Sequence, residues 1–209
     1  YGFRAGVEPT MAIYAQSYHE PLLSPREYLE REHRTDTKSE YEEGVLVAMS
    51  GASWEHIVIN SNLSLSLGSQ LKDKNCVVLS SDLRVRAEKR NRYYYPDTVV
   101  VCGKPQFEPN SFDSIVNPTM VIEILSPSTA ARDKGVKREV YQSLESLQAY
   151  LIVSQDAPRV LLYTRQEGDL WHEVTVVGLE SSLEIAALNC ILYLSEIYRN
   201  VEFSNTPSL

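Results

Sequence analysis

The stretch MVIEIL at residues 120–125 constrains the fold more than any other part of the chain. Side chains of a strand alternate between its two faces, so Glu123 shares one face with Val121 and Leu125, while three apolar residues occupy the other face. A strand with apolar residues on both faces is covered on both sides by other elements. The stretch therefore predicts a central sheet between two layers, with a carboxylate inside a buried strand, where an unpaired charge is costly.

Helices are predicted both before and after this strand. The motif SPRE, which begins at Ser24, matches a helix cap, a proline at the first helical position and a capping-box glutamate, and it predicts a short helix over about 25–33. Ser53 precedes a longer helix in which isoleucine and leucine recur at near-helical spacing. The charged amphipathic stretch ARDKGVKREVYQSLESL predicts a third helix, capped near Ser128 or Thr129.

Strands account for most of the remaining sequence. Segments rich in β-branched and aromatic residues are separated by short polar turns such as EKRNR, DAP and EGD. Together with the helices they predict an α/β (α+β) fold in which a central mixed β-sheet is flanked by helices. The predicted strands are the EYEEGVLVAMS segment around Gly44, NCVVLSSDLRVRA, YYYPDTVVVCG, MVIEIL, QAYLIVS, RVLLYTRQ and LWHEVTVV, and LNCILYLSEIYRN is expected to form a final strand or helix.

The totals describe an ordinary globular chain. Its 209 residues and 43% hydrophobic content suffice for one core, so we expect a single domain over residues 24–203, an N-terminal extension over 1–23 and a C-terminal tail over 204–209. Met11 is a candidate native start, which would make the preceding YGFRAGVEPT segment a cloning remnant or an extension. A net charge of −8 argues against a chain whose whole surface binds nucleic acid, because phosphate binding is driven by lysine and arginine.

Cysteine use and hydropathy predict the compartment. Cys76, Cys102 and Cys190 are odd in number, far apart in the sequence and next to apolar residues, so we expect three buried thiols in a reducing cytoplasm and neither a disulfide nor a thiolate metal site. No apolar run approaches the roughly 18 to 20 residues that span a bilayer. We therefore expect a cytoplasmic protein without a membrane partner.

The sequence lacks the motifs of several common chemistries. It contains no GxGxxG or GxxxxGK[ST] loop to hold a nucleotide phosphate, and no HExxH or GxSxG motif. We therefore expect no nucleotide cofactor and no serine-hydrolase chemistry.

Acidic and basic side chains on predicted strands and on the third helix are the remaining candidates for chemistry. In YYYPDTVVV, Asp97 follows Pro96 at the start of the strand, and it can converge with Glu123 at one end of the sheet if the two strands are neighbours. Two partly desolvated carboxylates repel each other unless a cation stabilises their charged forms. A divalent metal with oxygen ligands does so, and Mg²⁺ is the first candidate.

The third helix adds a basic group to this pair. Asp133, Lys137 and Tyr141 recur every four residues and form one stripe of the helix. Lys137 then lies at the border of the buried face, where it can lean over a site on the sheet. The neighbouring apolar stripe is expected to consist of Val136, Val140 and Leu144.

These motifs together resemble a known group of proteins. The PD pair at 96–97, EILSPST at 123–129 and the D-x-x-x-K-x-x-x-Y stripe are similar to those of the PD-(D/E)XK nuclease superfamily, and specifically of the bacterial Uma-two type family of restriction endonucleases. The resemblance extends over roughly residues 24–203. Supporting matches are Glu40 four residues before Gly44, His56 at the start of the long helix, and DLRV at 82–85.

The resemblance implies a restriction-endonuclease-like core and a metal site. Asp97 and Glu123 would bind Mg²⁺ or Mn²⁺ together with the backbone carbonyl of Ile124, and Glu40, on a helix or turn, would complete the site. The superfamily pattern places a lysine two residues after the glutamate, where this chain has Leu125. Lys137 is the expected substitute.

The implied activity is that of a metal-dependent endonuclease that hydrolyses phosphodiester bonds, with DNA as substrate and a homodimer as the assembly. Lys137 would orient the attacking water or stabilise the developing charge, and His56 would contact phosphate or shuttle a proton. Tyr141 is expected to be a packing residue whose hydroxyl reaches a neighbour. The alternative is a nuclease-fold protein without activity that works as a binding or regulatory module, as the acidic composition and Leu125 suggest.

Several assignments stay open at the level of sequence. Glu123 could instead be a structural carboxylate paired with Lys137 or Arg132. The target sequence, the choice between DNA and RNA, the cut position and the pathway have no readable signal. Also open are the choice among Glu40, Glu42 and Glu43, and the place of Asp82 and Arg84 in the site wall or in strand pairing.

Overall fold

The structure is a computed structural model that describes residues 22–49, 51–80, 82–126 and 129–203. The expected C-terminal tail over 204–209, Met11 and nearly all of the expected N-terminal extension lie outside the described residues, as does the helix-cap candidate Ser128.

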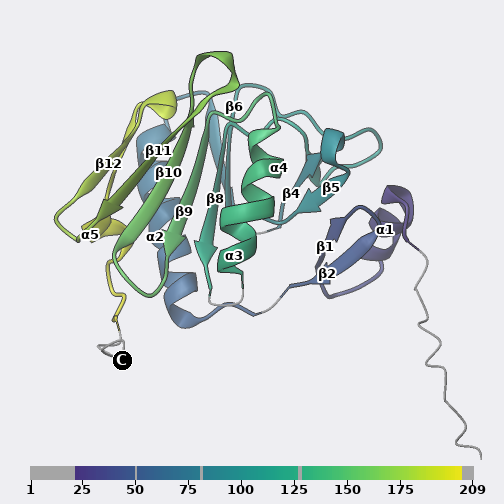
Figure 1. Cartoon of the computed structure of the whole chain (residues 1–209), viewed down its shortest axis with the longest axis horizontal. Helices are drawn as coiled ribbons and strands as arrows, with labels where there is room; N and C mark the ends of the chain where they lie inside the picture. The colour runs from purple at the N-terminus through teal and green to yellow at the C-terminus, as the bar shows by residue number, and fades with distance from the viewer. Residues whose placement is uncertain (1–21, 50, 81, 127–128, 204–209) are drawn as a thin grey trace, which may run out of the picture.

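A six-stranded mixed sheet forms the centre of the molecule (Figure 1), as predicted. Its strand order is β11-β10-β9-β8-β6-β3, and β8 pairs with β9 in parallel while every other neighbouring pair in this sheet is antiparallel. The strand MVIEIL is β8, in the interior of the sheet. The strands are β3 (Cys76–Ser80), β6 (Thr98–Cys102), β8 (Met120–Leu125), β9 (Ala149–Ser154), β10 (Arg159–Arg165) and β11 (Trp171–Val177).

A second, five-stranded sheet has the order β2-β1-β5-β4-β7, and a two-stranded sheet pairs β12 with β13. Two segments that were each predicted as one strand are split between the two larger sheets: NCVVLSSDLRVRA forms β3 and β4, and YYYPDTVVVCG forms β5 and β6. The second break falls at Pro96, whose missing N–H cannot continue a ladder. The additional strands are β1 (Ser39–Glu42), β2 (Val45–Ala48), β4 (Arg84–Ala87), β5 (Arg92–Tyr94), β7 (Ser114–Ile115), β12 (Ser182–Ile185) and β13 (Cys190–Tyr193).

The first two helices follow their sequence signals. Helix α1 (Pro25–Glu32) begins after Ser24, whose hydroxyl accepts from the Glu27 amide in a complete capping box. Helix α2 (Trp54–Leu71) is capped by Ser53. Short 3₁₀ turns (Glu88–Arg90, Glu167–Asp169 and Ala186–Leu188) connect strands, and α5 (Leu194–Ile197) follows β13, so that LNCILYLSEIYRN contains both a strand and a helix.

The third predicted helix is a composite. It consists of α3 (Ala130–Arg132), a π-helical turn η2 (Asp133–Lys137) and α4 (Arg138–Gln142), and it ends before the predicted ESL residues. Thr129 precedes α3. Its amide donates to the Ser126 hydroxyl at 3.3 Å, and its hydroxyl accepts from the Ser126 amide at 3.3 Å. Thr129 is therefore at the N-cap position, as one of the two expected candidates, but its side chain makes no capping hydrogen bond to the helix and contacts Ser126 instead.

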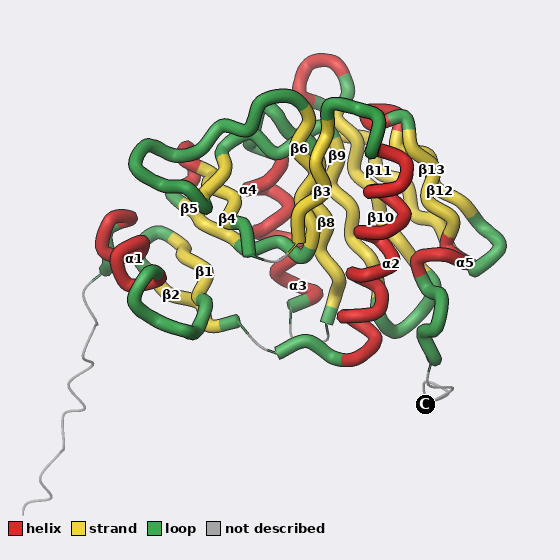
Figure 2. The backbone as a smooth tube through the Cα atoms, turned by 180° about the vertical axis from the view of Figure 1, so that it is seen from behind, coloured by secondary structure: helices red, strands yellow, loops and turns green. Residues whose placement is uncertain are grey.

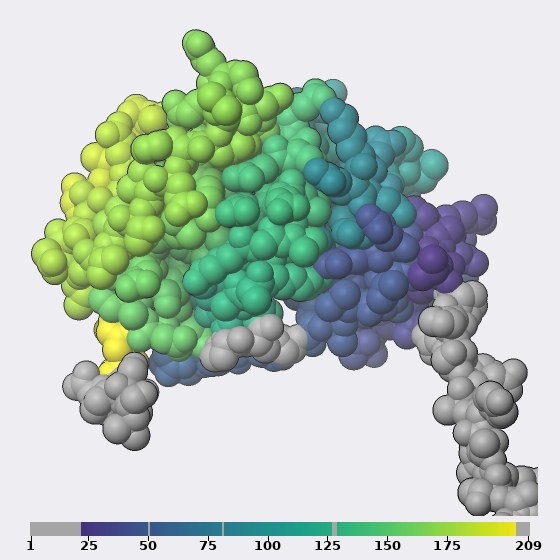
Figure 3. All heavy atoms as spheres, viewed as in Figure 1, coloured from purple at the N-terminus to yellow at the C-terminus, as the bar shows by residue number. Residues whose placement is uncertain are grey.

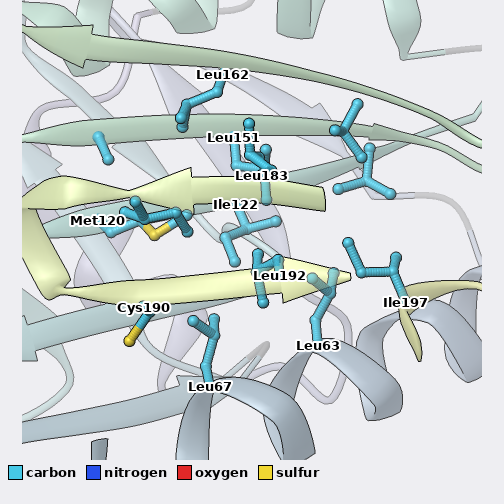
Figure 4. Packing of buried hydrophobic residues seen from close by; sticks show 14 of the residues in the cluster. Leu63, Leu67, Met120, Ile122, Leu151, Leu162, Leu183, Cys190, Leu192 and Ile197 are labelled. Carbon is cyan, nitrogen blue, oxygen red and sulfur yellow. The ribbon is translucent and has the colours of Figure 1, made fainter. Parts of the chain in front are cut away.

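Both faces of the central sheet are covered, as the composition of β8 predicted. On one face lie α2, α5 and the β12–β13 hairpin, which Figure 2 shows from outside and Figure 4 in detail. On the other face lie α4 and the inner side of the five-stranded sheet. Figure 3 shows the N-terminal segment, in purple and blue, seated against teal and green segments of the surface. The buried face of α2 consists of Ile59, Leu63, Ser66, Leu67 and Leu71.

The expectation of three free thiols is wrong for two of the cysteines. Cys76 and Cys102 form a disulfide, and only Cys190 is a free buried cysteine. The two bonded residues lie directly opposite each other on the antiparallel strands β3 and β6, with Cα atoms 4.0 Å apart. Their separation of 26 residues in sequence hides this cross-strand pairing.

Because of this disulfide, we expect the free energy of unfolding to depend on whether the protein is oxidised or reduced. A link across 26 residues restricts the unfolded chain, and its removal is expected to lower the free energy of unfolding by roughly 3 kcal/mol. Urea unfolding with and without dithiothreitol measures the difference. The double variant Cys76→Ser/Cys102→Ser is the control and is expected to be indifferent to reductant. Equal stability of the wild type in both conditions would contradict the prediction.

Within the described residues, no helix combines the length and the apolar character that are needed to cross a bilayer.

Candidate active site

The break between β5 and β6 places Asp97 beside Glu123. The register pairs Thr98 with Ile122, so the residues one step further, Asp97 and Glu123, face each other across β6 and β8. The Oδ2 atom of Asp97 accepts from the amide of Ile124 at 2.7 Å. The other oxygen, Oδ1, lies 2.9 Å from Nε2 of His56, in the first turn of α2. The predicted convergence of the two strands is therefore present in the structure.

Glu123 is buried, with 4% of its surface exposed. Its Oε1 accepts from Nζ of Lys137 at 3.0 Å and from the hydroxyl of Tyr141 at 2.9 Å. Among the described residues, nothing donates a hydrogen bond to its Oε2. The carboxylate is thus held by one oxygen and keeps the other available.

Lys137 lies at the centre of a group of carboxylates. Its Nζ is 2.9 Å from Oε1 of Glu40 and 3.5 Å from Oδ1 of Asp133, in addition to its contact with Glu123. All four side chains are buried. Leu125 lies on the same face of β8 and packs in the apolar layer, so it supplies no charge next to Glu123. The structure places the ammonium of Lys137 there instead.

The π-helical turn explains how Asp133 and Lys137 both face the sheet. A π-helix closes its hydrogen bonds between residues five apart, so its turn is wider than that of an α-helix. Residues four apart, such as Asp133 and Lys137, then lie nearly on the same side. The same widening turns Val136 outward, where it is 46% exposed, so its predicted place in the apolar stripe is wrong, whereas Val140 and Leu144 are buried as expected.

The charges of this cluster perturb one another. Burial raises the pKa of Glu123 well above its usual range, and the charges of Asp97, Asp133 and Glu40 add to this effect, while Lys137 opposes it. Burial also raises the pKa of Asp133. Burial lowers the pKa of Lys137, but the three carboxylates around it raise that pKa by more, to well above its ordinary value. Lys137 is therefore an ammonium ion.

Arg132 is a site residue that the sequence suggested only as a partner of Glu123. It instead forms ion pairs with Glu40 and Glu42, and its guanidinium lies 5.3 Å from the ring centre of Tyr94. Glu40 and Glu42 share one face of β1 by two-residue alternation, which is the signal that could have identified a common partner. Arg132 thereby fastens β1 of the second sheet to the helix that carries Lys137.

The open choices among acidic residues are resolved by position. Glu40 lies on strand β1, not on a helix or turn, and contacts Lys137, whereas Glu43 lies at the β1–β2 turn and pairs with Arg92. Neither Asp82 nor Arg84 belongs to the site. Asp82 is exposed and pairs with Lys38, while Arg84 is buried at the start of β4 in the second sheet and pairs with Asp113.

The donor set fits a hard divalent cation that is held by two carboxylates. Mg²⁺ is commonly bound through one or two carboxylates plus substrate phosphates, and here Oε2 of Glu123 and the partly exposed Asp97 are the candidates. Within the described part of the chain, no group of three or more histidine, cysteine, aspartate or glutamate side chains is arranged to hold a metal. Glu40 is instead paired with Lys137 and Arg132.

Comparisons with known proteins agree with this fold. The family model Uma2, described as "Putative restriction endonuclease", matches residues 25–194. Two proteins of Synechocystis sp. (strain PCC 6803), called "Uncharacterized protein" sll1609 and slr1290, are 32% and 33% identical to the chain, over 79% and 92% of its length and 93% and 100% of theirs. The crystal structure of "a putative nuclease belonging to DUF820" from Anabaena variabilis superimposes with a TM-score of 0.63 at 19% identity, and the match covers 78% of this chain and 91% of that one.

Proposed function

Since the chain belongs to the Uma2 family of restriction-endonuclease-like proteins, we propose that it is a metal-dependent endonuclease that hydrolyses phosphodiester bonds in DNA, with Mg²⁺ or Mn²⁺ as cofactor. The observation that carries the proposal is the convergence of Asp97, Glu123 and Lys137 at one end of β6 and β8, where one carboxylate oxygen is left available. The homodimer is part of the proposal, because cleavage of a duplex needs access to two strands.

The accessibility of the site residues assigns different roles to them. Asp97 and His56 have side chains that are 19% and 16% exposed, so they form the end of the cluster that a substrate can reach. Lys137 is buried, with 5% of its surface exposed. It acts on Glu123 from the interior, where its positive charge and its hydrogen bond fix the orientation of that carboxylate. Lys137 is therefore a positioning residue.

The chemistry follows from these roles. A divalent cation bound by Asp97 and Glu123 would polarise the scissile phosphate and lower the pKa of a bound water. In hydrolysis, the water oxygen would bond to phosphorus as the bond to the leaving oxygen breaks, and the proton released by the water would end on the leaving oxygen or in solvent. The Ile124 amide and His56 hold the two oxygens of Asp97, so its carboxylate is already oriented before a cation binds. His56 is also the nearest group that could contact phosphate or carry a proton.

The test is a nuclease assay of the wild type and of two isosteric variants, Asp97→Asn and Glu123→Gln. Each variant is expected to lose on the order of 100-fold or more in rate, because each removes a charged cation ligand. Plasmid DNA, single-stranded DNA and RNA are incubated with Mg²⁺, Mn²⁺ or chelator. Glu139→Gln, at an exposed position of α4, is the matched control and is expected to keep the wild-type rate.

The alternative of an inactive binding or regulatory module has one observation in its favour. The ammonium of Lys137 is enclosed by three carboxylates, so it has no direct path to a substrate. Under this alternative, the wild type would bind nucleic acid without cutting it, and Glu123→Gln would bind equally well. Failure of the wild type to cleave any of the substrates with either metal would exclude the nuclease proposal.

A further inference from the structure

The outer face of α2 is an uncharged apolar surface on a protein with a net charge of −8. Residues 57–71 contain no aspartate, glutamate, lysine or arginine, although 23% of the chain is charged. Figure 2 shows α2 as the outermost element on its side of the central sheet. A surface helix ordinarily carries its charges on the face turned away from the core. The missing charges indicate that this face has a partner.

The exposed residues of α2 form one stripe. Trp54, Ile57 and Leu65 are 70%, 52% and 60% exposed, and Ser61 and Ser69 complete a series with spacings of three and four residues. The buried residues of α2 lie on the opposite side, against β8 and β9. The large side chains of the stripe therefore contribute to no core within the described part of the chain. Exposed large apolar side chains that lie on one face without charged residues among them are typical of interaction surfaces.

The stripe continues onto neighbouring elements. A groove of about 600 Å³ runs between α2, β13 and α5, and Leu65, Ile191 and Tyr193 contribute apolar side chains to it. Glu196 and Arg199 lie on its α5 side and are both exposed. The groove thus adds apolar area beside the helix and carries one charge of each sign.

We propose that the α2 face is the homodimer interface and that a second copy of this chain occupies it through an antiparallel α2–α2 contact. The inference rests on the homodimer of the proposed function and names its surface. Ile57 and Leu65 are each four residues from Ser61, so a two-fold axis at Ser61 places Ile57 against Leu65 of the partner subunit and Leu65 against the partner's Ile57. This reciprocity is what a two-fold interface requires.

Charge and side-chain size also favour a second copy. Two chains that each carry −8 repel unless they meet through a neutral face, and α2 offers one. Glu196 of one copy and the partner's Arg199 have opposite charges, so these two exposed residues can pair across the interface. The small side chain of Ser61 at the crossing point lets the helices approach to the usual 8–10 Å.

The first test is the oligomeric state, measured by sedimentation equilibrium at micromolar concentrations without nucleic acid or metal. We expect a wild-type dimer, and we expect Leu65→Glu and Ile57→Glu to raise the dimer dissociation constant at least a hundredfold, because each places two like charges in the interface. Both positions are exposed, and circular dichroism checks that each variant is folded. Glu139→Gln is the control and is expected to remain dimeric.

Cross-linking tests the register of the contact. Ser61→Cys is expected to form a disulfide-linked dimer under mild oxidation, since the two-fold axis brings the two thiols together, whereas Glu139→Cys on α4 is expected to stay monomeric on a non-reducing gel. A monomeric wild type, or a dimer that survives Leu65→Glu and gives no Ser61→Cys product, would overturn the inference. So would loss of DNA binding in Leu65→Glu without a change in oligomeric state, which would make the face a nucleic-acid surface. None of these results depends on cleavage, so they leave the nuclease assay to be judged separately.

Discussion

Lys137→Met is expected to lower the free energy of unfolding by roughly 3–5 kcal/mol at pH 8, because removal of one partner leaves buried carboxylates without their counter-charge. Methionine keeps much of the length of the lysine side chain and removes only the ammonium. Glu40 and Glu123 each lie within 3.0 Å of that ammonium and Asp133 within 3.5 Å. The expected loss is thus electrostatic and not a consequence of a cavity.

The loss is expected to depend on pH. A carboxyl group whose pKa is raised in the folded protein binds its proton more tightly there than in the unfolded chain, so it favours folding at low pH, and this contribution is lost as pH rises through the folded pKa. Burial already raises the pKa values of Glu123 and Asp133, and without Lys137 they rise further. The destabilisation should therefore be small near pH 5 and largest near pH 8.

Urea unfolding of the wild type and Lys137→Met at pH 5 and pH 8 measures both effects. Lys134→Met is a matched control, since Lys134 belongs to the same π-helical turn but is exposed. Adding Glu123→Gln to Lys137→Met should recover part of the loss at pH 8, because it removes one of the uncompensated charges. If Lys137→Met were as stable as Lys134→Met at pH 8, the cluster would not depend on the ammonium.

The sequence predicted the centre of this site because the relevant information is local. Alternation along β8 gives the face on which Glu123 lies, and the four-residue spacing links Asp133, Lys137 and Tyr141. The pairing of β6 with β8 was the one assumption, and the register that pairs Thr98 with Ile122 bears it out.

The outer part of the site could not be read in the same way. The ion pairs of Arg132 with Glu40 and Glu42 join residues that are 92 and 90 positions apart, through a second sheet whose strands looked like continuations of the first. The cross-strand disulfide has the same origin, because it follows from the register of β3 and β6 and not from the spacing of Cys76 and Cys102. Non-local pairing carries little signal in a single sequence.

The same buried clusters predict a second large effect, which is unfolding in alkali. Burial raises the pKa values of seven tyrosines well above the ordinary value, in several cases against the opposing effect of nearby arginines. They are distributed over the three clusters of buried hydrophobic residues or lie beside them. The seven are Tyr28, Tyr93, Tyr94, Tyr95, Tyr141, Tyr150 and Tyr198.

The sign follows from the protons that each state binds. In the unfolded chain these phenols titrate near pH 10, whereas in the folded protein they keep their protons to higher pH, so stability is present below about pH 10 and is lost above it. At pH 11 each phenol accounts for about 1.4 kcal/mol, and seven of them for roughly 10 kcal/mol. This is comparable with the whole stability of a typical domain, about 5–15 kcal/mol, so the protein is expected to unfold near pH 11.

Circular dichroism and the ultraviolet absorbance of phenolate, followed together as pH rises from 9 to about 12, test this coupling. The two signals should change together, because the buried phenols ionise only when the chain unfolds. Tyr28→Phe removes one of the seven titrating phenols, so the free energy of unfolding of this variant should fall less steeply with pH above pH 10. The variant also loses the hydrogen bond from the Tyr28 hydroxyl to the carbonyl of Ser39. Appearance of most of the phenolate signal in a chain that still has its folded spectrum would show that these tyrosines do not hold the fold against alkali.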